Sequence, residues 1–358
     1  MPHLITSAFD VTEQWLTEVL EASGVARGAA VVSFESEAVG TGQMGENARF
    51  TLEWNEQLGQ PATVVGKFPS DNEISRATAT GGGSYVREVR FYREVAQTVG
   101  IRTPRCHFAD VDDGTGLFVL LMEDLAPGVQ GDQLAGCSPD EAATALDELV
   151  RLQAPRWNDP SLNEIDWLSR RHEGTATVTM LYEAVLPGFM NRIGGGLDSE
   201  SQKLVERFSG LIDQWRERTS TDHLVISHGD YRLDNMMFGE IGPNADPMAV
   251  GDWQTPAHGV PGTDLSYFLG AGLLPDVRAT HERDLVADYH AKLISAGVEG
   301  YDLDACWTSY RRESFAGIIM AVVASQIVVQ TDRGDDMFLA MASRHARQAL
   351  ELDAEAAI

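Results

Sequence analysis

Residues 226–238 of the chain read Ile-Ser-His-Gly-Asp-Tyr-Arg-Leu-Asp-Asn-Met-Met-Phe, and Gly-Asp-Trp-Gln follows at 251–254. These segments supply the carboxylate of Asp230, the amide of Asn235 and the carboxylate of Asp252. One carboxylate can receive a hydroxyl proton while the amide and the second carboxylate hold a metal ion. Kinase-type phosphoryl transfer needs this division of roles, because it depends on positioning and charge neutralisation and requires no protein nucleophile. We therefore predict that Asp230 accepts or orients a substrate hydroxyl and that Asn235 and Asp252 bind Mg²⁺.

The other polar residues of this region have less specific roles. We expect His228 to orient the loop through hydrogen bonds rather than to act as a base, and Asp234 to be a structural acid rather than a metal ligand. Arg232 could contact phosphate or substrate, or could balance Asp230 or Asp234. Asp264 is expected to brace the loop or to cap a helix.

A glycine pattern lies near the amino terminus. Residues 40–45, Gly-Thr-Gly-Gln-Met-Gly, fit Gly-x-Gly-x-x-Gly, which in a dinucleotide-binding fold must open a helix. Here residues 48–54 follow, and their alternating apolar and polar side chains predict a strand. We therefore expect Gly40, Gly42 and Gly45 to form a hairpin that can lie over phosphates and donate backbone N–H groups. An ordinary flexible hairpin is the alternative.

A lysine and a glutamate follow this hairpin. Lys67 is near the end of an apolar strand predicted over 62–68, from which its ammonium could reach the α- and β-phosphates. Glu88 lies on the apolar face of a helix predicted over 85–97, where an unpaired carboxylate is costly. An ion pair would fix the direction of the lysine and offset the burial of both charges. The alternative is two unrelated charges.

The segment Leu-Leu-Met-Glu-Asp-Leu at 120–125 is predicted to be the crossover between two lobes. Its backbone could hydrogen-bond an adenine edge, so Met122, Glu123 and Asp124 are assigned to nucleotide binding. Asp124 could instead cap a helix of the second lobe.

Periodicity predicts a β-rich first part and a helical second part. A helix is expected over 11–20 with Thr12 as its cap, and the glycine-rich residues 77–84 are expected to form a mobile connector. Strands are expected near 31–34, 48–54, 62–68, 105–110 and 117–123, and later helices over 198–216, 285–293, 305–330 and 336–354. The predicted fold class is α+β with two lobes: a small β-rich nucleotide-binding lobe at 1–124 with one key helix, and a large, mainly helical catalytic and substrate-binding lobe at 125–358.

Charge narrows the range of partners. The chain of 358 residues has 27 Lys and Arg against 54 Asp and Glu, a formal net charge of −27. Such a surface repels nucleic acid and anionic membranes. It would also favour a cationic substrate, although an acidic surface often serves solubility alone.

The cysteines and apolar runs indicate a soluble, cytoplasmic protein. Cys106, Cys137 and Cys306 are widely separated, so we expect buried free thiols and neither a disulfide framework nor a zinc site. No secretory signal is visible, and the longest apolar run, 316–329, is too short to span a bilayer and suits a buried helix. The oligomeric state is not indicated.

The motifs resemble those of the aminoglycoside and choline phosphotransferase superfamily, in particular its ecdysteroid-kinase-like branch. The resemblance rests on His-Gly-Asp-x4-Asn followed by Asp-Trp, and on the segments 40–47, 87–92, 121–125, 227–238 and 252–269. It implies a protein-kinase-like fold and ATP- and Mg²⁺-dependent phosphorylation of a small-molecule hydroxyl. The acceptor stays open, because the superfamily spans aminoglycosides, choline, sugars and steroids. Leu-Gln-Ala at 152–154 departs from the Leu-His-Ala often found there.

Other functions are less well supported. A nucleotide- or ligand-binding pseudokinase is the main alternative, and a protein kinase is disfavoured because no activation segment is evident after Asp252. The zinc-protease motif His-Glu-x-x-His and the hydrolase motif Gly-x-Ser-x-Gly are absent from the sequence. Acceptor contacts are expected from helices after 168 and 269, although core packing explains most candidates equally well: Trp167, Tyr182, Tyr267, Trp307, Tyr310 and Arg311.

Overall fold

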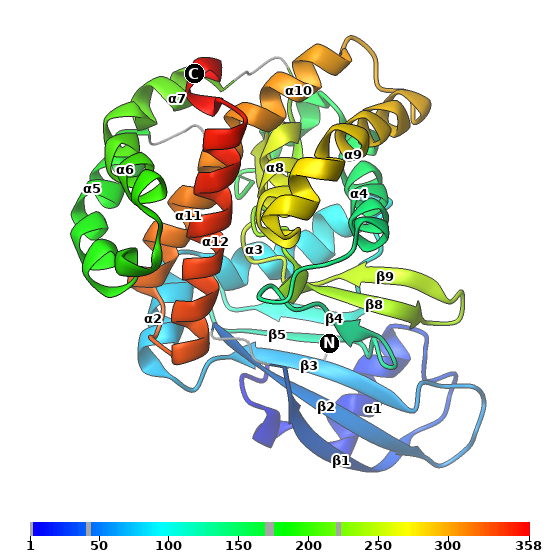
Figure 1. Ribbon diagram of the computed structural model, residues 1–358. Helices are drawn as coiled ribbons and strands as arrows, with labels where there is room; N and C mark the ends of the chain where they lie inside the picture. Colours follow the sequence, from blue (N-terminus) through cyan, green and yellow to red (C-terminus); the bar gives the residue numbers. More distant parts are fainter. Residues whose placement is uncertain (1–2, 41–43, 169–174, 220–222) are drawn as a thin grey trace. The chain divides into compact units, whose positions relative to one another are not determined.

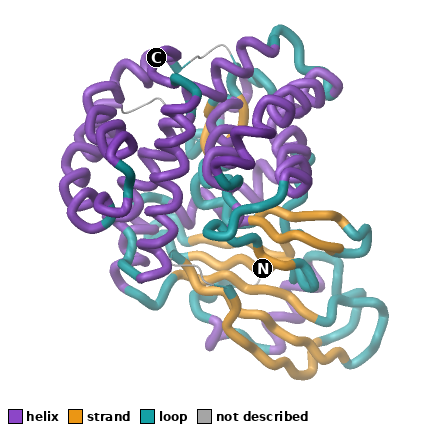
Figure 2. The backbone as a smooth tube through the Cα atoms, in the orientation of Figure 1, coloured by secondary structure: helices purple, strands orange, loops and turns teal. Residues whose placement is uncertain are grey.

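The computed structural model describes residues 3–40, 44–168, 175–219 and 223–358. The chain forms two compact units, and neither is a single stretch of sequence. The amino-terminal unit comprises Met1–Gln97, Thr103–Pro127 and Gly251–Gln254, and the carboxy-terminal unit comprises Thr98–Arg102, Gly128–Val250 and Thr255–Ile358. Figure 2 shows that strands dominate the first unit and helices the second.

The amino-terminal unit is built on a five-stranded antiparallel sheet with the order β1-β2-β3-β5-β4 (Figure 1). Helix α1 (Glu13–Ala22) begins at Thr12, whose side chain accepts a hydrogen bond from the Trp15 amide at 3.1 Å, as expected for its cap. Trp15 and its apolar neighbours are buried with the sheet in one core. The strands are β1 (Val31–Val39), β2 (Gly45–Trp54), β3 (Thr63–Pro69), β4 (Cys106–Val111) and β5 (Phe118–Glu123).

Two helices connect β3 to β4. They are α2 (Glu73–Gly81) and α3 (Ser84–Arg90), and α3 continues through a π turn, Phe91–Val95, and a 3-10 turn, Ala96–Thr98. The prediction of a mobile connector over 77–84 was therefore wrong. Asn72 caps α2 by accepting hydrogen bonds from two backbone amides, and the glycines only end the helix. Gly83, with φ +68°, makes the break between α2 and α3.

The carboxy-terminal unit is mainly helical and carries two small sheets with the orders β6-β8-β9 and β10-β7. Its strands are β6 (Val129–Gln130), β7 (Val225–Ser227), β8 (Met236–Ile241), β9 (Asp246–Val250) and β10 (Ala257–Gly259). Its helices are α4 (Pro139–Gln153), α5 (Thr175–Arg192), α6 (Ser199–Phe208), α7 (Ile212–Arg218), α8 (Pro261–Gly272), α9 (Pro275–Ser295), α10 (Leu303–Arg312), α11 (Ser314–Ile327) and α12 (Asp332–Glu351). Every residue of α8 is buried, so this helix forms part of the centre of the unit.

Two helices predicted as continuous are each divided. The segment 305–330 forms α10 and α11, and 198–216 forms α6 and most of α7. The break between α10 and α11 lies at Glu313, whose buried carboxylate accepts hydrogen bonds from Thr219 and Thr263. One buried polar residue hardly changes the spacing of the apolar residues around it. The spacing alone therefore did not reveal the helix break.

The α+β class with a β-rich unit and a largely helical unit is confirmed. Within the described ranges, no helix combines the length and the apolar character needed to cross a membrane.

Candidate active site

The motif at 226–238 folds as a strand, a loop and a second strand. Strand β7 ends at Ser227 and β8 begins at Met236, so residues 228–235 form the connecting segment, which we call the catalytic loop. Asp264, in the first turn of α8, accepts hydrogen bonds from the backbone amides of His228 at 2.7 Å and Gly229 at 2.9 Å. The carboxylate of Asp264 thus braces the loop, which is one of the two roles expected for it.

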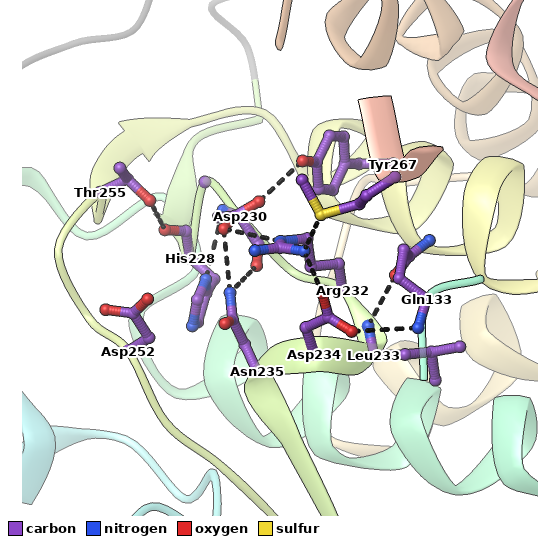
Figure 3. A network of polar contacts seen from close by, with 12 residues as sticks. Gln133, His228, Asp230, Arg232, Leu233, Asp234, Asn235, Asp252, Thr255 and Tyr267 are labelled. Atoms are coloured by element: carbon purple, nitrogen blue, oxygen red, sulfur yellow. Dashed lines mark hydrogen bonds and ion pairs between the residues drawn. The ribbon is translucent and has the colours of Figure 1, made fainter. Parts of the chain in front are cut away.

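Asp230 lies at the centre of a polar network in this loop (Figure 3). Its Oδ2 accepts hydrogen bonds from Arg232 Nε and Asn235 Nδ2, both at 3.0 Å, and its Oδ1 accepts one from the Tyr267 hydroxyl at 2.7 Å. The backbone amide of Asp230 donates to His228 Nδ1 at 3.2 Å. The Asp230 side chain is 21% exposed, so a substrate hydroxyl can still approach it.

These contacts control the charge of Asp230. Burial alone would raise the pKa of Asp230, but the charge of Arg232 and the hydrogen bonds from Tyr267 and Arg232 hold that pKa below its usual value. The group is therefore an ionised carboxylate at neutral pH. It is a good hydrogen-bond acceptor and a weak base.

Arg232 and Asp234 bind each other, and each also has other hydrogen-bond partners. Arg232 donates through Nη1 to Asp234 Oδ2 at 2.7 Å, so it balances both acids of the loop. Asp234 also accepts hydrogen bonds from the Gln133 amide at 3.0 Å and from Arg333 at 3.3 Å. These contacts occupy both Asp234 oxygens and fit the predicted structural role of this residue.

Asn235 is turned toward Asp230. Its Nδ2 donates to the Asp230 backbone carbonyl at 2.8 Å as well as to the carboxylate. Because the amide nitrogen is used within the loop, the carbonyl oxygen Oδ1 is the atom of this side chain that can bind a cation.

The amino-terminal unit contains a second ionic cluster, around Lys67. Lys67 Nζ lies 2.7 Å from Glu88 Oε1 and 2.9 Å from Asp252 Oδ1. The Lys67 and Glu88 side chains are 9% and 1% exposed, whereas that of Asp252 is 40% exposed. Burial by itself would lower the pKa of Lys67, but the two carboxylates hold it above its usual value, and the lysine stays protonated. One cation with two anions leaves a net charge of −1 on the cluster.

The segment 251–254 is anchored to the helix that carries Glu88. The indole of Trp253 stacks on Phe91, with ring centroids 3.8 Å apart, and its Nε1 donates to Thr103 Oγ1 at 3.0 Å. Arg87 Nε donates to the Gln254 carbonyl at 3.1 Å. Asp252 itself has φ +60°, a conformation that is uncommon for residues other than glycine and that often occurs at functional sites.

The predicted glycine hairpin is described only in part. Gly42 lies outside the described residues. Gly40 has φ +79°, and Gly45 begins β2 opposite Pro69. A Cβ on Gly45 would come within 3.1 Å of the Phe68 carbonyl and 3.4 Å of Lys67 Cε, so β2 approaches the lysine closely where it has no side chain.

The predicted crossover continues from β5. The Glu123 amide donates to the Arg105 carbonyl at 2.8 Å, so this N–H is already used within the sheet, and Met122 is buried in the same strand. The carboxylate of Asp124 accepts hydrogen bonds from Arg49 Nε at 2.7 Å and from the Ala126 amide at 3.1 Å. The alternative of Asp124 as a helix cap is therefore wrong, because these contacts hold it in a turn.

The predicted site residues thus form two groups, one in each unit. Lys67, Glu88 and Asp252 are in contact in the first, and Asp230 and Asn235 in the second. The sequence named Tyr267 only as a candidate for acceptor contacts and missed its bond to Asp230. Two other tyrosines from the same set, Tyr182 and Tyr310, are fully buried, with hydroxyls bonded to the Val205 carbonyl and to Glu282.

Comparison with known proteins identifies similar folds and one matching family model. Residues 171–297, which include Asp230, Asn235 and Asp252, match the model of the ecdysteroid kinase-like family. A choline kinase from Cryptosporidium parvum Iowa II is similar in structure, with 8% identity over 90% of this chain and 89% of that chain and a TM-score of 0.57. The chain has the fold of kinase-like phosphotransferases.

Two further solved structures share this kinase-like fold. An ethanolamine kinase from Plasmodium vivax has 10% identity over 88% of this chain and 82% of that chain, with a TM-score of 0.54. The GDP complex of wild-type aminoglycoside 2'-phosphotransferase-IIIa has 13% identity over 94% of this chain and 99% of that chain, with a TM-score of 0.53. Comparison with curated protein sequences gives no match. The resemblance to the phosphotransferase superfamily and the two-lobed kinase-like fold, both predicted from the sequence, are confirmed.

Proposed function

We propose that the protein is a small-molecule kinase that transfers the γ-phosphate of ATP to a hydroxyl group. The observation that carries this proposal is the Asp230 carboxylate, which is ionised, partly exposed and held by donors from Arg232, Asn235 and Tyr267 in a kinase-like fold. Choline kinase, ethanolamine kinase and an aminoglycoside phosphotransferase with bound GDP have the same fold, which supports both the nucleotide and a small acceptor.

In this proposal Asp230 orients the acceptor. The acceptor hydroxyl donates a hydrogen bond to the carboxylate, which holds the oxygen in line with the phosphorus atom. Because the pKa of Asp230 is lowered, the carboxylate takes the proton only as the new P–O bond forms. A loose phosphoryl-transfer transition state tolerates this late proton transfer, since the acceptor oxygen carries little charge until then. Positioning is therefore the main contribution of Asp230.

Asn235 and Asp252 would hold Mg²⁺, and the residues fit such an ion. Asp252 is 40% exposed and belongs to a cluster with a net charge of −1, and Asn235 offers a carbonyl oxygen. Both are hard oxygen ligands of the kind Mg²⁺ prefers, and Mg²⁺ keeps several waters. When bound, the ion neutralises charge on the phosphates.

The residues of the amino-terminal unit would bind the nucleotide. Lys67, aimed by Glu88, would contact the α- and β-phosphates, and the glycine hairpin with Gly40, Gly42 and Gly45 would donate backbone N–H groups. The adenine edge would meet the backbone at Met122, Glu123 and Asp124, with donors from residues after Glu123 because its own amide is engaged. We propose residues 1–124 as the nucleotide-binding lobe and 125–358 as the catalytic and acceptor-binding lobe, with the segment Gly251–Gln254 of the second lobe packed in the amino-terminal unit.

A screen for Mg²⁺-dependent ADP formation tests the proposal. The protein is incubated with ATP and a library of hydroxylated metabolites that includes amino alcohols, aminoglycosides, sugars and steroids, and products are identified by mass. We expect one acceptor class to be phosphorylated by the wild type and not by Asp230→Asn. Nucleotide binding without turnover on any acceptor would favour the pseudokinase alternative. Phosphorylation of proteins alone would contradict the small-molecule assignment.

A further inference from the structure

We propose that Tyr267 is a positioning residue for the reaction, one that fixes the rotation of the Asp230 carboxylate through its hydroxyl. This inference rests on the proposed function of Asp230 and adds a residue from α8 to the catalytic loop. Tyr267 is separated from Asp230 by 37 positions in the sequence, yet its hydroxyl donates to Asp230 Oδ1 at 2.7 Å (Figure 3).

The two oxygens of Asp230 have different donors. Arg232 and Asn235 both donate to Oδ2, whereas Tyr267 donates to Oδ1. The torsion between Cβ and the carboxylate of an aspartate is broad, so donors on one oxygen alone leave the plane of the group loosely defined. The Tyr267 hydroxyl fixes that plane and leaves a lone pair of Oδ1 for the acceptor hydroxyl.

Tyr267 is itself held rigidly. The residue is 2% exposed, and its ring stacks on His345 of α12, with centroids 5.4 Å apart and an interplanar angle of 21°. The His345 ring fits because two neighbouring positions are glycines: a Cβ on Gly270 or Gly317 would come within 2.6 or 2.2 Å of its atoms. Helix α8 also supplies Asp264, which binds the backbone of the catalytic loop, so one buried helix fixes both the loop and its carboxylate.

A purely structural role is the alternative, since a buried tyrosine needs some acceptor for its hydroxyl. Other buried tyrosines in the described part of the chain meet that need in different ways: Tyr182 donates to the Val205 carbonyl at 2.9 Å, Tyr231 to the Ala145 carbonyl at 2.6 Å, and Tyr310 to the Glu282 carboxylate at 2.7 Å. What distinguishes Tyr267 is the exposure of its acceptor: the Asp230 side chain is 21% exposed, whereas that of Glu282 is 7% exposed. Tyr182→Phe is therefore a matched control. It also removes one hydroxyl from a buried ring, but that hydroxyl bonds to the Val205 carbonyl and not to the catalytic loop.

The kinetic test compares Tyr267→Phe with Tyr182→Phe in the full-length protein. With an acceptor from the screen, Tyr267→Phe should lower kcat about tenfold and leave the KM for ATP within about twofold, because it disorders the carboxylate and touches no nucleotide-binding residue. Tyr182→Phe should leave kcat unchanged, and both variants should keep melting temperatures within a few degrees of each other. An unchanged kcat in Tyr267→Phe, or an equal loss in Tyr182→Phe, would overturn the proposal.

A spectroscopic readout separates this inference from the proposed function. The chain has eight tyrosines, and with ¹³Cζ-tyrosine labelling the Tyr267 signal is assigned by its loss in Tyr267→Phe. Asp230→Ala should shift that signal and leave the Tyr182 signal in place. If the wild type phosphorylates no acceptor, the proposed function fails, and this shift still decides whether Tyr267 holds Asp230. A Tyr267 signal that Asp230→Ala does not move would overturn the inference.

Discussion

The two ionic clusters use the same kinds of groups in opposite ways. Around Lys67, two carboxylates surround one buried cation and aim it, and they come from positions far apart in the sequence, Glu88 and Asp252. Around Asp230, cationic and neutral donors surround one carboxylate, and most of them come from the same short loop. The first cluster has a formal surplus of negative charge and includes the partly exposed Asp252, whereas the second keeps the partly exposed Asp230 ionised. In the proposed reaction, the first cluster would bind phosphate and metal and the second would orient the hydroxyl.

Replacing the central carboxylate of the second cluster should have the largest effect. Asp230→Asn keeps the shape of the side chain but cannot accept the hydroxyl proton, so we expect kcat to fall by roughly 10³-fold. Asp234→Asn is the matched control in the same loop, and its kcat should fall less than about tenfold because its contacts are structural. The ratio of the two losses in a coupled ADP assay is the measurement. Equal losses would contradict the separate roles of the two acids.

Replacing the central cation of the first cluster should lower stability in addition to weakening nucleotide binding. Lys67→Met leaves Glu88 buried without its partner, so the free energy of unfolding should fall by about 3–5 kcal/mol. The double variant Lys67→Met/Glu88→Leu should recover much of this loss, since both charges are then gone. Urea denaturation followed by circular dichroism measures both.

The exposed pair Lys203–Glu200 provides the comparison for that experiment, because both side chains are 63% exposed. Lys203→Met should change the free energy of unfolding by no more than about 1 kcal/mol. A loss in Lys67→Met no larger than in Lys203→Met would show that the Lys67 cluster is not a buried ionic unit.

The smallest predicted effect is a pH dependence of stability that comes from His345, the residue on which Tyr267 stacks. Burial lowers the pKa of His345 from 6.5 to about 4, so the ring stays neutral in the folded protein. Between pH 6.5 and about pH 4, His345 is protonated in the unfolded chain but not in the folded chain. Stability is therefore lost as the pH falls through this window, by up to roughly 1.4 kcal/mol per pH unit from this group.

Denaturation curves at several pH values test whether the free energy of unfolding falls as the pH is lowered. His345→Gln should have a shallower decline in the free energy of unfolding from pH 6.5 to 4 than the wild type. His107 has a pKa lowered to about 4 as well and is unchanged in this variant, so only the difference in slope is assigned to His345. Identical slopes would show that His345 does not stay neutral behind Tyr267.

Contacts between residues that are close together in the sequence were the easiest to predict. The catalytic loop was recognisable because Asp230 and Asn235 are five positions apart and their side chains meet within one loop. The contact between Lys67 and Glu88 was predictable because an acid on an apolar helix face needs a cation. Their catalytic roles stay predictions.

Long-range contacts could not be predicted in the same way. Asp252 was assigned only to metal, yet it also contacts Lys67 across 185 positions of sequence. Tyr267 lies on a helix that is buried on every side, where an aromatic residue fits core packing as well as function. Helix α2 was missed because Asn72, its cap, precedes a glycine-rich segment that is typical of loops.

In the proposed reaction, the two clusters serve one Mg²⁺-dependent transfer of phosphate. The most direct test is to incubate the wild type and Asp252→Ala with γ-³²P-labelled ATP, Mg²⁺ and the acceptor library, and to count label in the small-molecule products. We predict labelled product from the wild type only in the presence of Mg²⁺ and none from Asp252→Ala, while circular dichroism shows that the variant is folded. Transfer by Asp252→Ala at the rate of the wild type would contradict the account.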